Sequence, residues 1–108
     1  MAFERAASID EVWSGEMAGV VVGGARVLIV NVDGEVHAFE DRCAHQGSPL
    51  SRGRLDGALL TCASHEWQYD ARTGESINPR GAHLRRFAVR IEQGEVLVDV
   101  SAASRGRS

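Results

Sequence analysis

Short apolar runs rich in β-branched residues, separated by glycine-containing turns, recur along most of this chain. The first three runs cover residues 17–22, 26–32 and 35–40. The turn pairs Gly23-Gly24 and Asp33-Gly34 lie between them. Two-residue turns of this composition favour hairpins, because their residues readily take the positive φ angles of the tight turns that join two antiparallel strands. The first 40 residues are therefore predicted to hold three consecutive β-strands.

The second half of the chain repeats this pattern. Its apolar runs cover residues 58–61, 67–70, 75–77, 87–92 and 95–100. The last two runs alternate apolar and polar residues across Gln93-Gly94, which predicts a hairpin with one apolar face on each strand. Ser8 followed by Asp10 and Glu11 has the composition of a helix N-cap and an acidic first turn, so one short helical turn is expected there. The sequence predicts an all-β, antiparallel fold.

Composition limits the chain to one small domain. The chain has 108 residues, and we expect a domain over residues 1–100 followed by a disordered polar tail over 101–108. The formal net charge of −3 gives no reason to expect nucleic-acid binding. The apolar runs are too short to cross a bilayer and no signal peptide is evident, which predicts a cytoplasmic protein away from the membrane.

Two short clusters, Cys43-Ala44-His45 and Cys62-Ala63-Ser64-His65, contain every cysteine of the chain. Both clusters fall in loops beside predicted strands, so each loop can offer one sulfur and one nitrogen. Two thiolates on one iron and two imidazoles on the other are the ligand set of a Rieske [2Fe–2S] centre. We therefore predict that Cys43, His45, Cys62 and His65 bind one such cluster, and that the chain carries single electrons.

These residues leave three other interpretations open. The two cysteines could form a disulfide, although nothing indicates export to an oxidising compartment. The four residues could instead form a Cys₂His₂ zinc site in a small binding module, although structural zinc sites mostly place two cysteines two to four residues apart. The residues could also bind no metal. Iron–sulfur ligation is favoured because each cluster pairs one cysteine with one histidine.

From residue 3 to about residue 100 the chain resembles the Rieske-type ferredoxins of bacterial multicomponent oxygenases. It is most similar to those of the soluble di-iron toluene and alkene monooxygenases. The resemblance is carried by Cys43-Ala44-His45-Gln46, Leu50, Gly53, Thr61-Cys62-Ala63-Ser64-His65-Glu66-Trp67, Thr73-Gly74-Glu75 and Ile77-Asn78-Pro79. It implies a Rieske-type antiparallel β-sandwich with a small cluster-binding subdomain of two loops.

The resemblance also implies a function in aromatic hydrocarbon catabolism. The chain would be an electron-transfer component rather than an enzyme, and a monomer. It would receive electrons from an NADH-dependent flavin reductase and pass them to the hydroxylase of the oxygenase. Cys43 and Cys62 would bind the buried iron, and His45 and His65 the outer iron. The ferredoxin of an aromatic-ring dioxygenase and the small Rieske subunit of a nitrite reductase remain as alternatives.

The residues beside these ligands suggest a docking surface. We expect it to consist of Gln46, Pro49, Glu66, Trp67 and Pro79. Trp67 could equally be a core residue of the following strand.

Three further expectations concern residues near the ligands and elsewhere. Tyr69 could either donate a hydrogen bond to the cluster or pack in the core. Glu66 occupies a position at which many Rieske proteins have glycine, and its negative charge should lower the reduction potential. His37 and His83 are expected at the surface, and Trp13 is expected to pack near the N-terminal turn.

Overall fold

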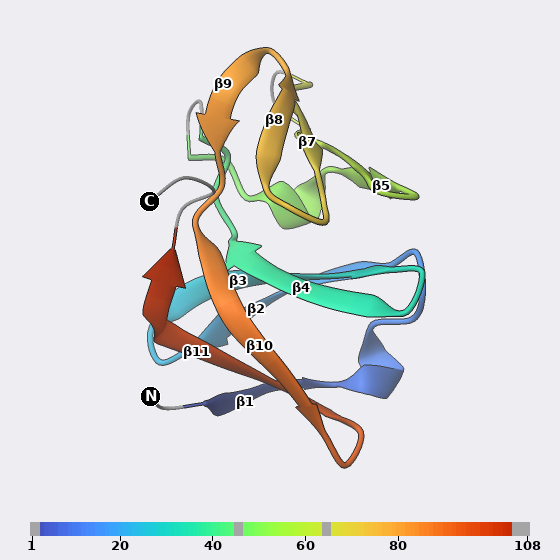
Figure 1. Ribbon diagram of the computed structural model, residues 1–108, viewed down its shortest axis with the longest axis vertical. Helices are drawn as coiled ribbons and strands as arrows, with labels where there is room; N and C mark the ends of the chain where they lie inside the picture. Colours follow the sequence, from blue (N-terminus) through green and yellow to red (C-terminus); the bar gives the residue numbers. More distant parts are fainter. Residues whose placement is uncertain (1–2, 45–46, 64–65, 105–108) are drawn as a thin grey trace.

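Two antiparallel β-sheets make up the computed structural model (Figure 1), which describes residues 3–44, 47–63 and 66–104 and, over 101–104, the backbone alone. The larger sheet has the order β1 (Glu4–Ser8), β11 (Glu95–Ser104), β10 (Arg86–Glu92), β4 (Glu35–Glu40), β3 (Ala25–Val32) and β2 (Met17–Val22). The smaller sheet has the order β5 (Arg54–Asp56), β6 (Leu59–Thr61), β7 (Gln68–Asp70), β8 (Glu75–Asn78) and β9 (Arg80–His83). The predicted all-β, antiparallel fold is confirmed.

Helical structure in the described part of the chain is limited to two 3₁₀ turns, η1 (Ile9–Glu11) and η2 (Leu50–Arg52). The predicted N-cap of η1 is present: Asp10 N donates to Ser8 Oγ over 3.3 Å, and Ser8 N donates to Glu11 Oε1 over 2.7 Å. Within those same residues no helix has the length and apolar character needed to cross a membrane.

The three predicted hairpin turns join β2 to β3, β3 to β4 and β10 to β11. Both residues of each turn have positive φ, which is the backbone of a twisted two-residue hairpin turn. The non-glycine residues among them, Asp33 and Gln93, have φ values of 53° and 52°. The local turn chemistry was therefore sufficient to locate these three connections.

Strand β3 is buried on both faces and so joins two separate hydrophobic cores. Val27 and Ile29 point into the core of the larger sheet, whereas Leu28 and Val30 point into the core beneath the smaller sheet. Because side chains alternate along a strand, an uninterrupted apolar run is what burial on both faces requires. The core beneath the smaller sheet also contains both cysteines, so the larger sheet directly supports the predicted site.

The structure corrects several sequence-based expectations. Strands β1, β5 and β9 were not predicted, because two of them are short and β1 lacks an alternating pattern. Strand β11 continues to Ser104 and pairs there with Arg86 of β10, so the tail expected to be disordered from Ser101 begins as a strand. Trp13, which was expected to pack near the N-terminal turn, is 63% exposed.

Candidate metal centre

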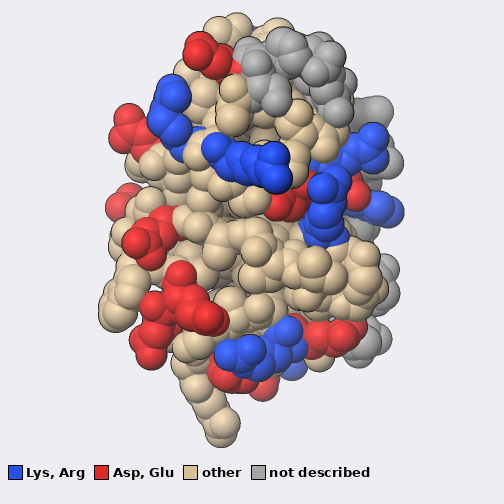
Figure 2. Space-filling model, turned by 180° about the vertical axis from the view of Figure 1, so that it is seen from behind, with Lys and Arg blue, Asp and Glu red and all other residues tan. Residues whose placement is uncertain are grey.

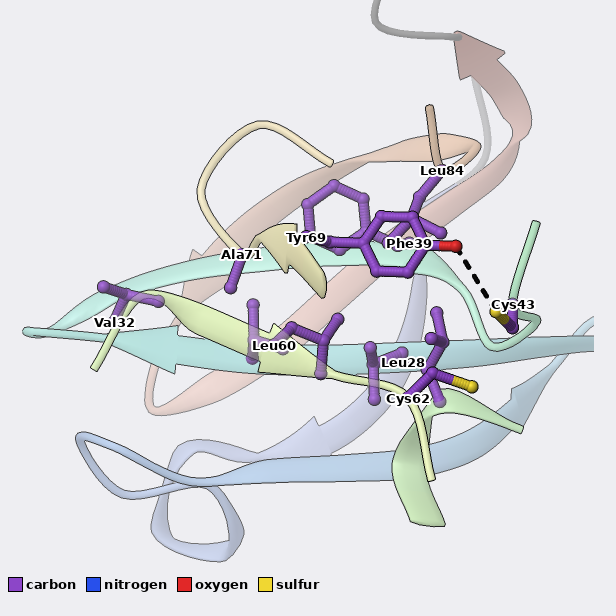
Figure 3. Packing of buried hydrophobic residues seen from close by; sticks show 11 residues of the cluster. Leu28, Val32, Phe39, Cys43, Leu60, Cys62, Tyr69, Ala71 and Leu84 are labelled. Atoms are coloured by element: carbon purple, nitrogen blue, oxygen red, sulfur yellow. Dashed lines mark hydrogen bonds between the residues drawn. The ribbon is translucent and has the colours of Figure 1, made fainter. Parts of the chain in front are cut away.

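The two cysteines lie at the same end of one hydrophobic core. Cys43 is 2% exposed and Cys62 is fully buried, and both are packed with Leu28, Phe39 and Tyr69 (Figure 3). The two cysteines are not joined by a disulfide, so the alternative of a disulfide is wrong. The structure thus brings together two thiols that are 19 positions apart in the sequence and shields them from bulk water.

The two loops that begin at these cysteines are closed by the same pair of backbone hydrogen bonds. In the first loop, Gly47 N donates to Cys43 O over 2.9 Å and Cys43 N donates to Ser48 O over 2.8 Å. In the second, Glu66 N donates to Cys62 O over 3.0 Å and Cys62 N donates to Trp67 O over 2.8 Å. Residues 43–48 and 62–67 therefore form two equivalent loops, each with its cysteine at the buried start.

This equivalence gives Gly47 and Glu66 the same place in their loops. Both residues have a left-handed backbone, with φ of 77° at Gly47 and 57° at Glu66. Glycine takes this conformation without steric cost, whereas a residue with a Cβ does so at a cost of about 1 kcal/mol. Glu66 is thus an exposed residue at a loop position where the backbone favours glycine.

Tyr69, on β7, connects the smaller sheet to the first loop. Its hydroxyl lies 3.3 Å from Cys43 Sγ (Figure 3) and accepts a hydrogen bond from Ala44 N over 3.1 Å. Burial, and after it the hydrogen bond to Cys43, raises the pKa of Tyr69, so the hydroxyl keeps its proton at neutral pH. Because Ala44 N–H already donates to the hydroxyl oxygen, the hydroxyl proton is left to donate to Sγ when Cys43 is a thiolate.

Tyr69 is completely buried, which confirms the alternative that it packs in the core, and its hydroxyl also contacts a predicted ligand, Cys43. A hydrogen bond from Tyr69 to the cluster itself stays a prediction. A buried tyrosine requires a partner for its hydroxyl, and the partner here is 26 residues away in the sequence. Only the alternation of residues along β7 gave an indication that Tyr69 could face the site.

A buried carboxylate fixes the chain that follows the first loop. Asp41 is 5% exposed and accepts hydrogen bonds from Ser51 N over 2.8 Å and from Ser51 Oγ over 2.7 Å. Gly19 on β2 leaves space for this pair, since a Cβ there would lie 2.6 Å from Ser51 Oγ. The sequence analysis did not identify Asp41 or Ser51, because no local motif links two residues that meet only in the folded chain.

The remaining predicted site residues are distributed as follows. His45, Gln46 and His65 lie outside the described residues. Of the expected docking residues, Glu66 and Pro79 are exposed and Pro49 is half-buried. Trp67 is also half-buried and packs against the core that contains the cysteines, as the core interpretation of this residue expected.

The two histidines predicted to lie at the surface are partly buried. One ring nitrogen of each, Nε2 of His37 and Nδ1 of His83, is inaccessible to solvent and forms no hydrogen bond with the described residues. His37 stacks on Phe39, with 6.5 Å between ring centroids, and burial lowers its pKa. The expectation of surface positions was therefore wrong, and His37 Nδ1 lies 3.5 Å from Arg86 Nη2 of β10.

The donor set suits a thiolate-bound metal centre. Two buried cysteine thiols lie at one end of the core, and a tyrosine hydroxyl is in place to stabilise one of them as a thiolate. Among described residues, no third His, Cys, Asp or Glu side chain joins them in a metal-binding group. Any further ligands would therefore come from the loop residues 45–46 and 64–65.

Comparison with known proteins agrees with this geometry. The chain is 40% identical over 93 residues to the "Alkene monooxygenase system, ferredoxin component" of Xanthobacter autotrophicus strain Py2, covering 84% of this chain and 75% of that protein. It is 41% identical over 106 residues to the "Biphenyl dioxygenase ferredoxin subunit" of Pseudomonas sp. strain KKS102, covering 96% and 97% of the two chains. The predicted identity as an electron-carrying ferredoxin component, rather than an enzyme, is confirmed by these relatives.

Solved structures show the same fold. The match to the complex of reduced oxygenase and oxidised ferredoxin in carbazole 1,9a-dioxygenase has a TM-score of 0.80 at 30% identity, covering 89% of this chain and 91% of that one. The family description "Rieske [2Fe-2S] domain" matches residues 3–88. With this match over most of its length, the chain belongs to the Rieske [2Fe–2S] family.

Proposed function

We propose that this chain is a soluble, monomeric Rieske ferredoxin that carries single electrons from an NADH-dependent flavin reductase to a di-iron monooxygenase hydroxylase. Family membership implies one Rieske-type [2Fe–2S] cluster. We propose Cys43, His45, Cys62 and His65 as its ligands. Because NADH would supply the electrons, we place this exchange in the cytoplasm.

The observation that carries this proposal is the pair of equivalent loops. Each loop buries its cysteine at the start, and the alanine that follows the cysteine, Ala44 or Ala63, is exposed. A bound Rieske cluster supplies reversible one-electron chemistry. The chain itself shields the thiolates from water with Leu28 and Phe39, and Tyr69 donates to Cys43.

The acceptor is proposed from the relatives. The alkene monooxygenase ferredoxin component, at 40% identity, supports the monooxygenase branch that the sequence motifs favoured. A dioxygenase acceptor is the second candidate, because the biphenyl dioxygenase ferredoxin subunit is equally similar over nearly the whole chain. In either case the carrier must release one partner before it meets the next, which favours a small and short-lived interface.

The proposed docking surface for the oxygenase is the one predicted from the sequence. It consists of Gln46, Pro49, Glu66, Trp67 and Pro79. Of these, Glu66 and Pro79 are exposed. Trp67, the last residue of the second loop, is half-buried, and its exposed part would contribute an aromatic edge to the docking surface.

The ligand assignment predicts which substitutions abolish the cluster. Purified protein should contain iron and acid-labile sulfide and, when reduced, give the low-average-g electron paramagnetic resonance signal of a Rieske centre. Cys62→Ser and His65→Ala should lose the signal and the sulfide, because each removes a proposed ligand. His37→Gln, which removes a histidine that is not a proposed ligand, should keep both. Zinc in place of iron, or an intact signal in the Cys62 variant, would contradict the assignment.

The acceptor assignment predicts a difference in reoxidation rate. Chemically reduced ferredoxin, mixed anaerobically with the oxidised di-iron hydroxylase of the Xanthobacter alkene monooxygenase, should be reoxidised at least about tenfold faster than with the oxygenase of the biphenyl dioxygenase. Stopped-flow absorbance of the ferredoxin measures both rates, with ferredoxin alone as the control. A faster reaction with the dioxygenase would replace the first candidate by the second.

The contact between Tyr69 and Cys43 predicts a change in midpoint potential. Tyr69→Phe should lower the midpoint, because the hydroxyl stabilises the more electron-rich reduced state. A hydrogen bond that is stronger by about 1 kcal/mol in the reduced than in the oxidised state corresponds to a midpoint difference of about 40 mV for one electron. Ser76→Ala is a matched control, since Ser76 is another buried hydroxyl of the smaller sheet and bonds to Ala82 N rather than to a cysteine. Equal potentials in wild type and the Phe variant would show that the hydroxyl does not act on the centre.

The left-handed backbone of Glu66 predicts two separable effects. Glu66→Gln should raise the midpoint potential by removing a negative charge and leave stability unchanged. Glu66→Gly should raise the midpoint similarly and also increase the free energy of unfolding by about 0.5–1 kcal/mol, since glycine relieves the strain at positive φ. Redox titration and denaturant unfolding measure the two quantities. A Gly variant no more stable than the Gln variant would show that the loop is unstrained.

A further inference from the structure

A polar cleft lies beside the first loop, and none of the described oxygenase-docking residues (Pro49, Glu66, Trp67 and Pro79) lines it. Its volume is about 330 Å³, and it opens between the chain that leaves β4 and the link from β9 to β10, two segments that run side by side in Figure 1. The residues lining it include Glu40, Arg42, Cys43, Ala44, His83 and Arg85. The cleft is therefore in direct contact with the cysteine that begins the first loop.

The cleft is framed by two arginines that lack acidic partners. Arg42 and Arg85 are exposed, and neither has a carboxylate within 4.0 Å in the part of the chain that the structure describes. Elsewhere on the surface, Arg5, Arg72 and Arg90 each form an ion pair. Arginine side chains also gather on the upper half of the face in Figure 2, whereas acidic side chains predominate on its lower half.

The two walls of the cleft, each of which carries one arginine, are joined by the backbone. The backbone carbonyl of Arg85 accepts a hydrogen bond from Glu40 N over 2.8 Å. A Cβ at Gly47 would lie 3.1 Å from Arg42 Nε, so the Arg42 guanidinium lies directly against the first loop. Among the described residues that line the cleft, Glu40 is the one carboxylate; it is half-buried, and the two arginines leave a net excess of positive charge. Two neighbouring guanidinium groups are suited to bind carboxylates through two hydrogen bonds each.

We propose that this cleft binds carboxylate side chains of the electron-donating flavin reductase. The inference rests on the proposed function and assigns one of its two partners to a specific surface. The donor must bind the oxidised ferredoxin and release the reduced form. Reduction adds one negative charge to the ferredoxin next to the cleft, which weakens its attraction for a bound carboxylate and so favours release in the required direction.

The acceptor requires the opposite dependence on charge. It must bind the reduced ferredoxin and release the oxidised form, which favours a basic partner surface that faces an acidic group of the carrier. Glu66 on the second loop is such a group, and it is exposed. Charge therefore favours the donor at the arginine cleft and the acceptor at the second loop.

The test compares two double variants of the holoprotein that lose the same charge. Arg42→Gln/Arg85→Gln removes the cleft arginines, whereas Arg5→Gln/Arg90→Gln removes two arginines paired to Glu95 and Glu92 on the larger sheet. Affinity for the oxidised reductase is measured by calorimetry with oxidised ferredoxin, using the flavin reductase shown to reduce the wild-type protein. The cleft variant should bind about tenfold more weakly at about 50 mM salt, and the difference should shrink at about 500 mM. The control should stay within about twofold of wild type.

The same variants are then tested against the oxygenase. Affinity of the cleft variant for the oxygenase that reoxidises the wild-type protein should stay within about twofold. An equal loss of affinity for both partners would overturn the assignment to the donor, and equal losses in the two double variants would show that only overall charge matters. If no flavin reductase reduces the wild-type protein, the proposed function itself fails. If reduction is normal but the cleft variant binds as tightly as wild type, only the present inference fails.

Discussion

The structure depends on bringing two cysteines from separate loops to one end of a buried core. The backbone of Cys43 and of Cys62 forms the same two hydrogen bonds. The carbonyl of each cysteine accepts from the backbone N–H of the residue four positions later, and its N–H donates to the carbonyl of the residue five positions later. This closure turns the chain sharply, so that each cysteine stays in the apolar interior while the residues after it reach the surface. Two such loops can present four donors to one binuclear centre without a large domain.

The supporting sheet makes this arrangement rigid. Strand β3 contributes alternate side chains to the core of the larger sheet and to the core that contains the cysteines. Tyr69 and the Asp41–Ser51 pair then add polar ties between the loops and the sheets. Because all these polar groups have partners, the loops are positioned by directed hydrogen bonds as well as by packing.

Charge is distributed unevenly around this rigid end. Arg42 and Arg85 flank the first loop, whereas Glu66 projects from the second. An electron carrier changes its own charge at each transfer, so the sign of the groups beside the centre affects which partner is released and when. The family fold provides the centre, and these side chains give this particular ferredoxin two electrostatically different sides.

The sequence alone determined the two cysteine–histidine motifs, the all-β class and the three hairpin turns, because each depends on residues that are adjacent in the chain. The cysteine–histidine spacing identified the family, and Asp33-Gly34 and Gln93-Gly94 located their turns. Only the tertiary structure decided that β1 pairs with β11 and that the Tyr69 hydroxyl contacts Cys43. It also decided that Glu66 has the same place in its loop as Gly47, and that Arg42 and Arg85 line the same cleft. These features join residues far apart in the sequence, and no local propensity or spacing specifies which distant segments will pack together.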